Sequence, residues 1–209
     1  MSLETNWGYN LTGDVTTLQD LITEQEFNAL TAGKYSGNSR IAPEIKAASQ
    51  AIRNYCGWHI YPSAECSMTE RLLYGNGRAK RIGSDLMIQL PAKYVTAVTS
   101  VLIDDVTFTD YAFDSNGIIH VFDVPKMSRK TVIAIEYTSG ISDALMDSVK
   151  ELVAHRVTHA LASSNGVTSE AAGGVSVTYN ANWINSARAS ALPDDNKEVL
   201  APYKIQGVF

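Results

Sequence analysis

Cysteine, basic residues and long apolar runs are all scarce in this sequence, and each scarcity excludes a class of protein. Its 209 residues include two cysteines, Cys56 and Cys66, too few for the disulfide framework of a secreted domain, so we expect reduced thiols. Lys and Arg number 17 against 22 Asp and Glu, and the net charge of −5 argues against a broad nucleic-acid-binding surface. No stretch approaches the ~18 apolar residues of a membrane span, and no signal peptide is visible. We therefore expect a soluble protein made in the cytoplasm.

Helical and strand periodicities occupy different parts of the chain. Apolar residues at three- and four-residue spacing predict helices over about 16–31, 41–55, 142–163 and 196–205, the last of them shortened or kinked at Pro202. Between the second and third helices, short β-prone runs are separated by turn signals such as Gly75-Asn76-Gly77 and Asp104-Asp105. The strands predicted there are 69–74, 85–90, 95–103, 106–114, 118–122 and 131–138.

This order of elements predicts an α+β fold with a mainly helical core of three to four helices. An antiparallel β-meander would be inserted into that core, and a C-terminal strand plus helix would follow it. We expect one compact domain with an appended β lobe. Its parts would be residues 1–66 (helical), 67–138 (meander) and 139–209, the last holding the long helix, a mobile loop at 164–174, a strand at 175–179 and the final helix.

The best candidate for site chemistry is Glu151, His155 and His159, which share one face of the predicted long helix. A histidine pair with this spacing can bind zinc, and a carboxylate can serve as a third ligand. A solvated helix face or a subunit contact is the favoured interpretation, because no His-Glu-x-x-His order is present. We therefore assign no metal, cofactor or catalytic residue.

A second candidate is the glycine-rich and basic segment 75–83. No Gly-Lys-Ser/Thr follows it and no helix is expected to start there, so a basic hairpin tip is favoured over a phosphate-binding loop. Such a tip would be able to touch a neighbouring subunit or DNA. The carboxylate pairs Asp104-Asp105 and Asp194-Asp195 fit turns or caps better than an acid/base dyad.

Three stretches of the sequence, at 47–57, 166–179 and 192–204, carry patterns that belong together. In combination they resemble the head–tail connector (adaptor) proteins of tailed bacteriophages and prophages. The most specific is 166–170 followed by 173–179, where those proteins carry a Ser-Glu, then glycine, then a Ser-Val-Thr-Tyr-like strand; Gly174 stands where an acidic residue is common. Residues 47–57 resemble the early helix of that family, and 192–204 resemble its C-terminal helix. With 69–71 opening the meander, the resemblance spans about residues 18–205.

The resemblance implies a structural virion protein without catalysis, located at the head–tail interface after a stage in the host cytoplasm. It would form a ring, usually dodecameric, beneath the portal protein, extend the DNA channel and dock a tail or stopper protein. DNA would pass without sequence-specific binding, and no membrane would be involved. Residues 193–209 would reach the portal, and 164–174 would face a neighbour or the channel. The interface residues implied in this way are Ser169, Glu170, Tyr179, Asp194, Tyr203 and Lys204.

The distribution of charge is compatible with a ring, which needs two different faces of each subunit to meet. Residues 1–33 contain five acidic side chains and no Lys or Arg, whereas 34–64 is richer in basic ones. Opposite charges on the two stretches would steer neighbouring subunits together. The basic residues concerned are Lys34, Arg40, Lys46 and Arg53.

An alternative function remains open from the sequence. The strands of 67–138 would also suit a sheet-based ligand- or carbohydrate-binding module, or another tail-associated structural protein. A pocket lined by Tyr94, Tyr111 and Phe113 would favour the binding module.

Overall fold

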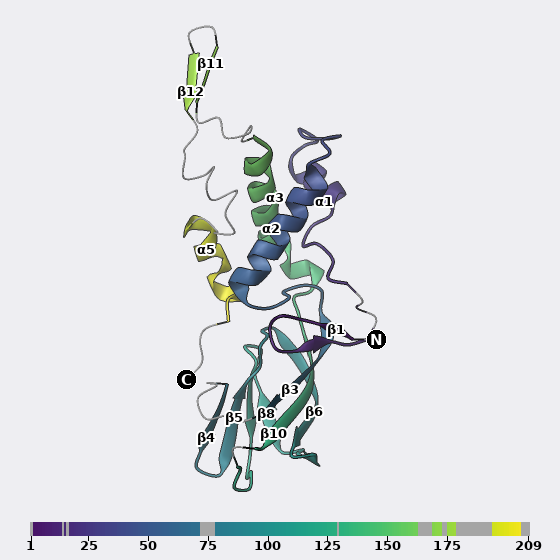
Figure 1. The fold of residues 1–209 in the computed structure, drawn as a ribbon, viewed down its shortest axis with the longest axis vertical. Helices are drawn as coiled ribbons and strands as arrows, with labels where there is room; N and C mark the ends of the chain where they lie inside the picture. The colour runs from purple at the N-terminus through teal and green to yellow at the C-terminus, as the bar shows by residue number, and fades with distance from the viewer. Residues whose placement is uncertain are drawn as a thin grey trace. The chain divides into compact units, whose positions relative to one another are not determined.

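The structure is a computed structural model that describes residues 2–13, 15, 17–71, 78–128, 130–162, 169–172, 175–178 and 194–205. The chain divides into two compact units, each assembled from separated parts of the sequence (Figure 1). The β unit consists of residues 1–19, 57–142 and 203–209. The helical unit consists of residues 20–56 and 143–202.

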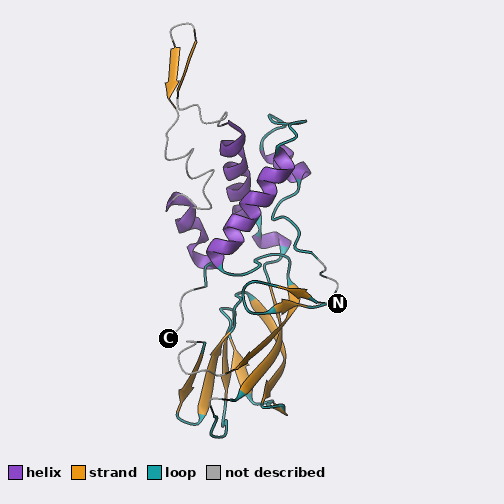
Figure 2. Ribbon diagram, in the orientation of Figure 1, coloured by secondary structure: helices purple, strands orange, loops and turns teal. Residues whose placement is uncertain are grey.

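Two antiparallel sheets build the β unit (Figure 2). The larger has the order β1-β2-β3-β10-β6-β7, and β10 lies between β3 and β6 and pairs with both. Its strands are β1 (Leu3–Glu4), β2 (Asn10–Leu11), β3 (Ala64–Arg71), β6 (Val95–Ile103), β7 (Val106–Thr107) and β10 (Val132–Ser139). The smaller has the order β4-β5-β9-β8, formed by β4 (Ala79–Ile82), β5 (Asp85–Gln89), β8 (Tyr111–Phe113) and β9 (Ile118–Val121).

Alternating burial gives each sheet one apolar face. Ile133, Ile135 and Tyr137 of β10 are buried, and the residues between them are less so. In the smaller sheet, Leu86 and Ile88 of β5 pair with Val121 and Ile119 of β9, and all four are at most 1% exposed. Because successive side chains of a strand point to opposite faces, these residues form the core of the β unit and leave the other faces to solvent or to partners.

The turn between β6 and β7 is the two-residue hairpin that Asp104-Asp105 predicts. Ile103 pairs with Val106, and both aspartates have positive φ, 49° and 63°, as a type I′ turn requires. The carboxylate of Asp104 accepts hydrogen bonds from the backbone N–H of Val132, at 2.8 Å, and from the hydroxyl of Thr131, at 3.0 Å. This aspartate therefore fastens the turn to the start of β10.

The helical unit contains α1 (Glu24–Leu30), α2 (Ile41–Cys56), the 3₁₀ turn η1 (Asp143–Leu145), α3 (Asp147–Ala162) and α5 (Asp194–Leu200). A two-stranded hairpin of β11 (Ser169–Ala172) and β12 (Val175–Thr178) also belongs to it, and the 3₁₀ turn η2 (Ala201–Tyr203) follows α5. The helices α2 and α3 pack on each other. Within the described residues, no helix has the length and apolarity that a membrane crossing requires.

The predicted fold class is wrong. Two antiparallel sheets of six and four strands dominate the fold, and the helices are short, so no helical core surrounds an inserted meander. The strands are also not arranged as a meander, because β3 pairs with β10, from the other end of the predicted strand region, and with β2 near the N-terminus. The strand predicted over 106–114 is divided between β7 of one sheet and β8 of the other. Periodicity identified strand-forming residues, but it carries no information on their partners.

Some of the predicted helices are confirmed, and others begin or end at different residues. The second helix is confirmed as α2, and Pro202 lies in η2 after α5 has ended at Leu200, as its effect on helices predicts. The first helix begins at Glu24 rather than near residue 16, because Thr23 caps it and forms a capping box with Glu26. The long helix begins at Asp147 and ends at Ala162, after the separate turn η1.

Candidate assembly surfaces

The predicted interface residues fall on separate segments of the chain. Ser169 and Glu170 begin β11, where they pair with Thr178 and Val177 of β12 (Figure 1). Asp194 is the first residue of α5, and Tyr179 lies outside the described residues. Four of the residues expected in the 164–174 loop, 169–172, are strand β11, and the strand expected at 175–179 is confirmed over 175–178.

Tyr203 packs among aromatic residues of the β unit, to which it belongs. Its ring stacks on Tyr94 with the centroids 5.8 Å apart, and Tyr94 stacks on Trp58 at 6.1 Å. The indole N–H of Trp58 donates a hydrogen bond of 2.6 Å to the carbonyl oxygen of Tyr203. Burial raises the pKa of Tyr94, and the nearby Tyr203 adds to the shift. The stack therefore fixes the position of Tyr203, and the side chain of Lys204, the next residue, is exposed.

Tyr9 attaches the N-terminal segment to His59, the residue that follows Trp58 in the sequence. The Tyr9 hydroxyl lies 2.6 Å from Nδ1 of His59 and accepts from the His59 backbone N–H at 3.0 Å. Nε2 of His59 faces the carbonyl oxygens of Pro62, at 3.0 Å, and Ser139, at 3.2 Å. A neutral imidazole with its hydrogen on Nε2 satisfies all of these groups, because the Tyr9 hydroxyl then donates to Nδ1.

Trp58 and His59 therefore form a buried pair, the joint, that binds Tyr203 near the C-terminus and Tyr9 near the N-terminus. Their rings meet edge to face, with centroids 5.4 Å apart, and both side chains are fully buried. No motif in the sequence connects Trp58 or His59 to a site. The adjacent aromatic pair was the only available signal, because its partners are distant in sequence.

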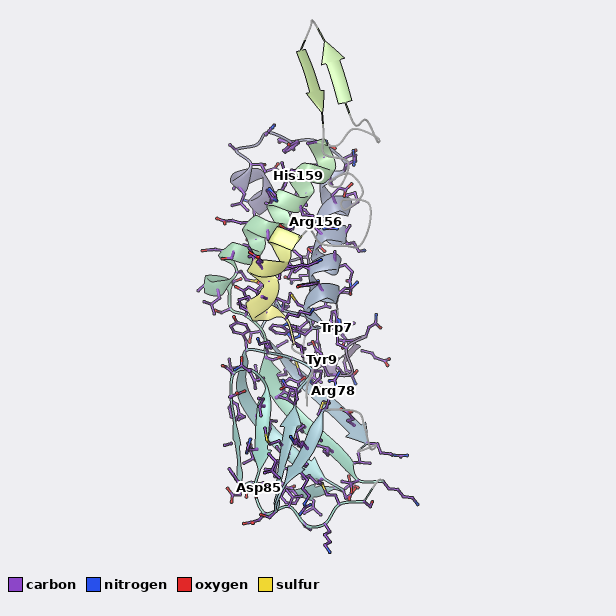
Figure 3. All side chains as sticks on the ribbon, turned by 90° about the vertical axis from the view of Figure 1, so that its left-hand side faces the viewer. Trp7, Tyr9, Arg78, Asp85, Arg156 and His159 are labelled. Carbon is purple, nitrogen blue, oxygen red and sulfur yellow. The ribbon has the colours of Figure 1, made fainter. Side chains whose placement is uncertain are left out.

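Two arginines of the predicted basic hairpin tip bind backbone carbonyls of the β unit. Arg78 donates to the carbonyl oxygen of Trp7 at 3.4 Å, and Figure 3 shows Arg78 near Trp7 and Tyr9. Arg81 donates to the carbonyl oxygens of Gly83, Val124 and Pro125 at 3.0, 2.7 and 2.8 Å. These guanidinium groups hold loops of their own chain, and the glycine-rich turn at 75–77 lies outside the described residues.

The basic side chains predicted to steer neighbours have different roles in the helical unit. Arg40 pairs with Glu44 at 3.0 Å and donates to the carbonyl oxygen of Ala160, at the end of α3, at 3.1 Å. Arg53 is only 2% exposed. Lys34 and Lys46 are exposed, and the ammonium of Lys34 lies 5.4 Å from the centre of the Tyr35 ring. Lys34 and Lys46 are thus the members of this set best placed to meet another molecule.

Glu26 joins α1 to α3. Its carboxylate accepts from the ammonium of Lys150 at 2.6 Å and from the Thr23 backbone N–H at 2.7 Å. The hydrogen bond from Lys150 lowers the pKa of Glu26 below its usual 4.5, and the Thr23 N–H lowers it further.

We expect the Glu26 interactions to stabilise the fold above pH 4.5 and to lose effect in acid. The folded-state pKa is the lower one, so the unfolded chain takes up protons first as the pH falls from about 4.5 through the folded-state value. Because the Glu26 side chain is 38% exposed, Glu26→Gln should lower the free energy of unfolding by no more than about 1 kcal/mol at neutral pH. Urea denaturation of the unmodified protein and of Glu26→Gln, from neutral to acidic pH, measures the difference in their free energies of unfolding. A difference that does not shrink in acid would contradict it.

His155 and His159 meet on α3, as their spacing predicts. Their Nε2 atoms are 3.2 Å apart, and their ring centroids are 4.5 Å apart. Burial lowers the pKa of His159, and the adjacent His155 lowers it further. Glu151 does not complete the predicted trio, since no three His, Cys, Asp or Glu side chains gather at metal-binding distance within the described part of the chain.

The aromatic pocket predicted for a binding module does not form from its three residues. Tyr94 stacks between Trp58 and Tyr203, and the Tyr111 hydroxyl donates to the carbonyl oxygen of Val98 at 3.0 Å. Phe113 instead borders an open hollow of about 380 Å³ on the smaller sheet. The residues around this hollow are Met87, Ala112, Phe113, Asp114, Ile118, His120 and Phe122.

Both cysteines are thiols outside any disulfide, as the sequence predicts, and both are buried. Burial raises the pKa of the Cys66 thiol to about 11, so little reactive thiolate is present at neutral pH. We expect an aromatic disulfide reagent to modify neither Cys56 nor Cys66 rapidly in the folded protein, and both in urea. Absorbance of the released thiolate measures the two rates. Equal rates in the folded and unfolded protein would contradict the burial.

Comparison with known families places the chain among the structural proteins of bacteriophage heads. The family model described as head completion protein matches residues 20–205, which include most of both units. The chain therefore belongs to the head completion protein family, and the resemblance to phage connector proteins is confirmed at that level. No curated protein sequence matches it. Membership makes it a virion structural protein that interacts with other head or tail components.

Proposed function

We propose that this head completion protein is a head–tail connector that assembles as a ring, of about twelve copies, beneath the portal protein. The ring extends the DNA channel and offers a docking face to a tail or stopper protein. Before assembly, the subunits are in the host cytoplasm. The family match over residues 20–205 is the observation that carries this proposal. In this role the protein acts without catalysis, through surfaces that contact the neighbouring subunits.

The charges exposed on the helical unit support ring formation. Lys34 and Lys46 are exposed, and so are the acidic Asp20 and Glu24. A ring forms when one face of a subunit contacts a different face of the next, so opposite charges on two faces favour the contact. Since exposed charges are screened by salt, the ring should be weakened at high ionic strength.

The charge balance also suits a channel through which DNA slides. A surface that neutralised many phosphates with lysine and arginine would hold the DNA. The chain has a net charge of −5, and Arg78 and Arg81 donate to backbone carbonyls of their own β unit. DNA therefore passes through the ring without sequence-specific contacts.

Ring formation is tested by reversing the two exposed lysines. We expect rings of the unmodified protein in negative-stain images and light scattering at low salt and high concentration. Lys34→Glu with Lys46→Glu should shift the mass towards the monomer. Lys126→Glu with Lys130→Glu reverses two exposed lysines of the β unit, so it is the charge-matched control and should have little effect. A tight dimer at every salt concentration would refute the ring.

Docking to the portal is assigned to the C-terminal segment 193–209. The segment is held at its base by the Tyr203 stack, and its exposed Lys204 follows directly. Ser169, Glu170, Tyr179 and Asp194 are proposed as further contacts, on the resemblance of their segments to connector proteins. Tyr203 has an internal role as well, so its own effect on docking would be partly indirect.

The docking experiment is co-purification with the cognate portal protein. Deleting all of 193–209 would remove the acceptor of the Trp58 N–H and disturb the fold. Deleting only 206–209 keeps that hydrogen bond, so it is the cleaner variant. We expect reduced capture by the portal with unchanged thermal stability. Full capture after this deletion would refute the role of the last residues.

The hollow on the smaller sheet favours a second candidate, a ligand-binding module. The hollow has a mostly apolar lining that also includes His120 and Asp114, and this combination is suited to a small sugar or aromatic compound. A ligand-dependent rise in melting temperature that Phe113→Ala abolishes, in a protein that forms no rings, would support this function over the connector.

A further inference from the structure

We propose that α3 carries a two-histidine site for a divalent transition metal ion, with zinc as the best fit. The ligands are the Nε2 atoms of His155 and His159, which one helical turn places on the same face of α3 (Figure 3 labels His159). The proposal does not depend on ring formation, because both ligands belong to one helix of one subunit.

The separation of the two nitrogens favours a tetrahedral ion. Zinc–nitrogen bonds of about 2.05 Å at the tetrahedral angle hold two ligand atoms about 3.3 Å apart. The right angle of a square-planar copper site would require about 2.9 Å. The observed Nε2–Nε2 distance is 3.2 Å, close to the tetrahedral separation. The ring centroids are 4.5 Å apart, so the rings have to turn outward for both Nε2 lone pairs to point at one ion.

The same contact also describes a hydrogen bond between the two rings, in which one Nε2 donates and the other accepts. For a metal ion to bind, the donor ring passes its Nε2 hydrogen to water and takes one up on Nδ1, so that each Nε2 offers a lone pair to the ion. The two states are therefore alternatives at one place, and zinc has to displace this exposed hydrogen bond. Such a bond contributes little net free energy in water.

The surroundings set the strength of the site. Arg156 follows His155 directly, and Arg40 lies against the carbonyl oxygen of Ala160, so positive charge on this part of the helical unit opposes a cation. Two imidazoles complete half of a tetrahedral shell, which leaves two positions for water or for a carboxylate of another protein.

Titration of zinc chloride into the full-length protein at neutral pH, followed by calorimetry, tests the site. We expect one zinc per chain, and a loss of affinity of roughly tenfold or more for His155→Ala and for His159→Ala. His120→Ala, which removes a partly exposed histidine of β9, is the matched control and should bind as the unmodified protein does. Circular dichroism checks that every variant is folded. Absence of stoichiometric binding, or equal binding by the histidine variants, would overturn the proposal.

Two further variants separate the two-histidine site from other arrangements. Glu151→Gln should leave affinity unchanged, because Glu151 is not part of the cluster, and a clear loss would refute a site built from two histidines. Glu151→His combined with His159→Ala recreates the same spacing one turn earlier, with His155 as the shared ligand. We expect it to recover most of the affinity lost in His159→Ala. Failure to recover would show that the spacing on α3 is not what binds the ion.

Discussion

Gly140→Ala is expected to lower the free energy of unfolding by about 3 kcal/mol or more. Gly140 follows β10 directly and has a φ of 130°, which side chains rarely tolerate. An added Cβ would lie 2.5 Å from Cα of Ser63 and closer still to the carbonyl oxygen of Pro62. Both of these obstacles are backbone atoms, so neither can rotate away.

Gly140→Ala would also disturb the joint formed by Trp58 and His59. The Pro62 carbonyl oxygen that the new methyl would displace is also a partner of His59 Nε2. Next to Gly140, the backbone N–H of Ile141 donates to the carbonyl oxygen of Ile60 at 2.8 Å. A shift at Gly140 would therefore weaken the hydrogen bonds around His59 in addition to the local packing.

Gly83→Ala is the matched control for Gly140→Ala. Gly83 has a positive φ of 64° in the same β unit, but an added Cβ would meet no atom within 4 Å. It should cost only the backbone strain of about 1 kcal/mol. Urea denaturation followed by circular dichroism gives both values. Similar losses for the two variants would show that close packing at Gly140 is not decisive.

Local features of this fold were predictable, because their causes lie within a few residues. The Asp104-Asp105 turn follows from the backbone conformation that a two-residue hairpin requires. The stripe of α2 and the interruption at Pro202 follow from periodicity and from proline geometry. The prediction of the first helix was wrong in its start, because apolar residues at helical spacing, including Leu21, lie in a non-helical segment. There the Leu21 N–H donates to the buried Ser49 hydroxyl.

The sheet order and the main contacts of the chain ends were not predictable, because they join residues that are distant in sequence. β10 pairs with β3 along its whole length, and strands of two residues such as β1 and β2 are too short to show alternation. The joint of Trp58 and His59 depends on Tyr9 and Tyr203, which nothing in the local sequence connects to it. By contrast, the approach of His155 to His159 follows from helical spacing alone.

Trp58→Ala is expected to lower the free energy of unfolding by about 3–5 kcal/mol and to release the C-terminal segment. The side chain is fully buried and stacks on Tyr94, so its removal leaves a large cavity. It also removes the donor of the 2.6 Å hydrogen bond to the Tyr203 carbonyl oxygen. Trp58→Phe keeps much of the ring but not the donor, so a loss of about 1–3 kcal/mol is expected for it.

Two measurements separate the loss of stability from the release of the segment. Urea denaturation gives the free energy, and hydrogen exchange of the backbone at 201–205 in the folded protein reports whether the segment is still held. We expect faster exchange there in both Trp58 variants. Trp7→Ala, which removes a partly exposed tryptophan of the same unit, should leave that exchange unchanged and cost about 1 kcal/mol. Because this segment is the one proposed to bind the portal, Trp58→Phe should also weaken capture by the portal protein, although residue 58 is buried.

Unchanged exchange at 201–205 in Trp58→Phe would show that packing of Tyr203 on Tyr94 holds the segment without the hydrogen bond.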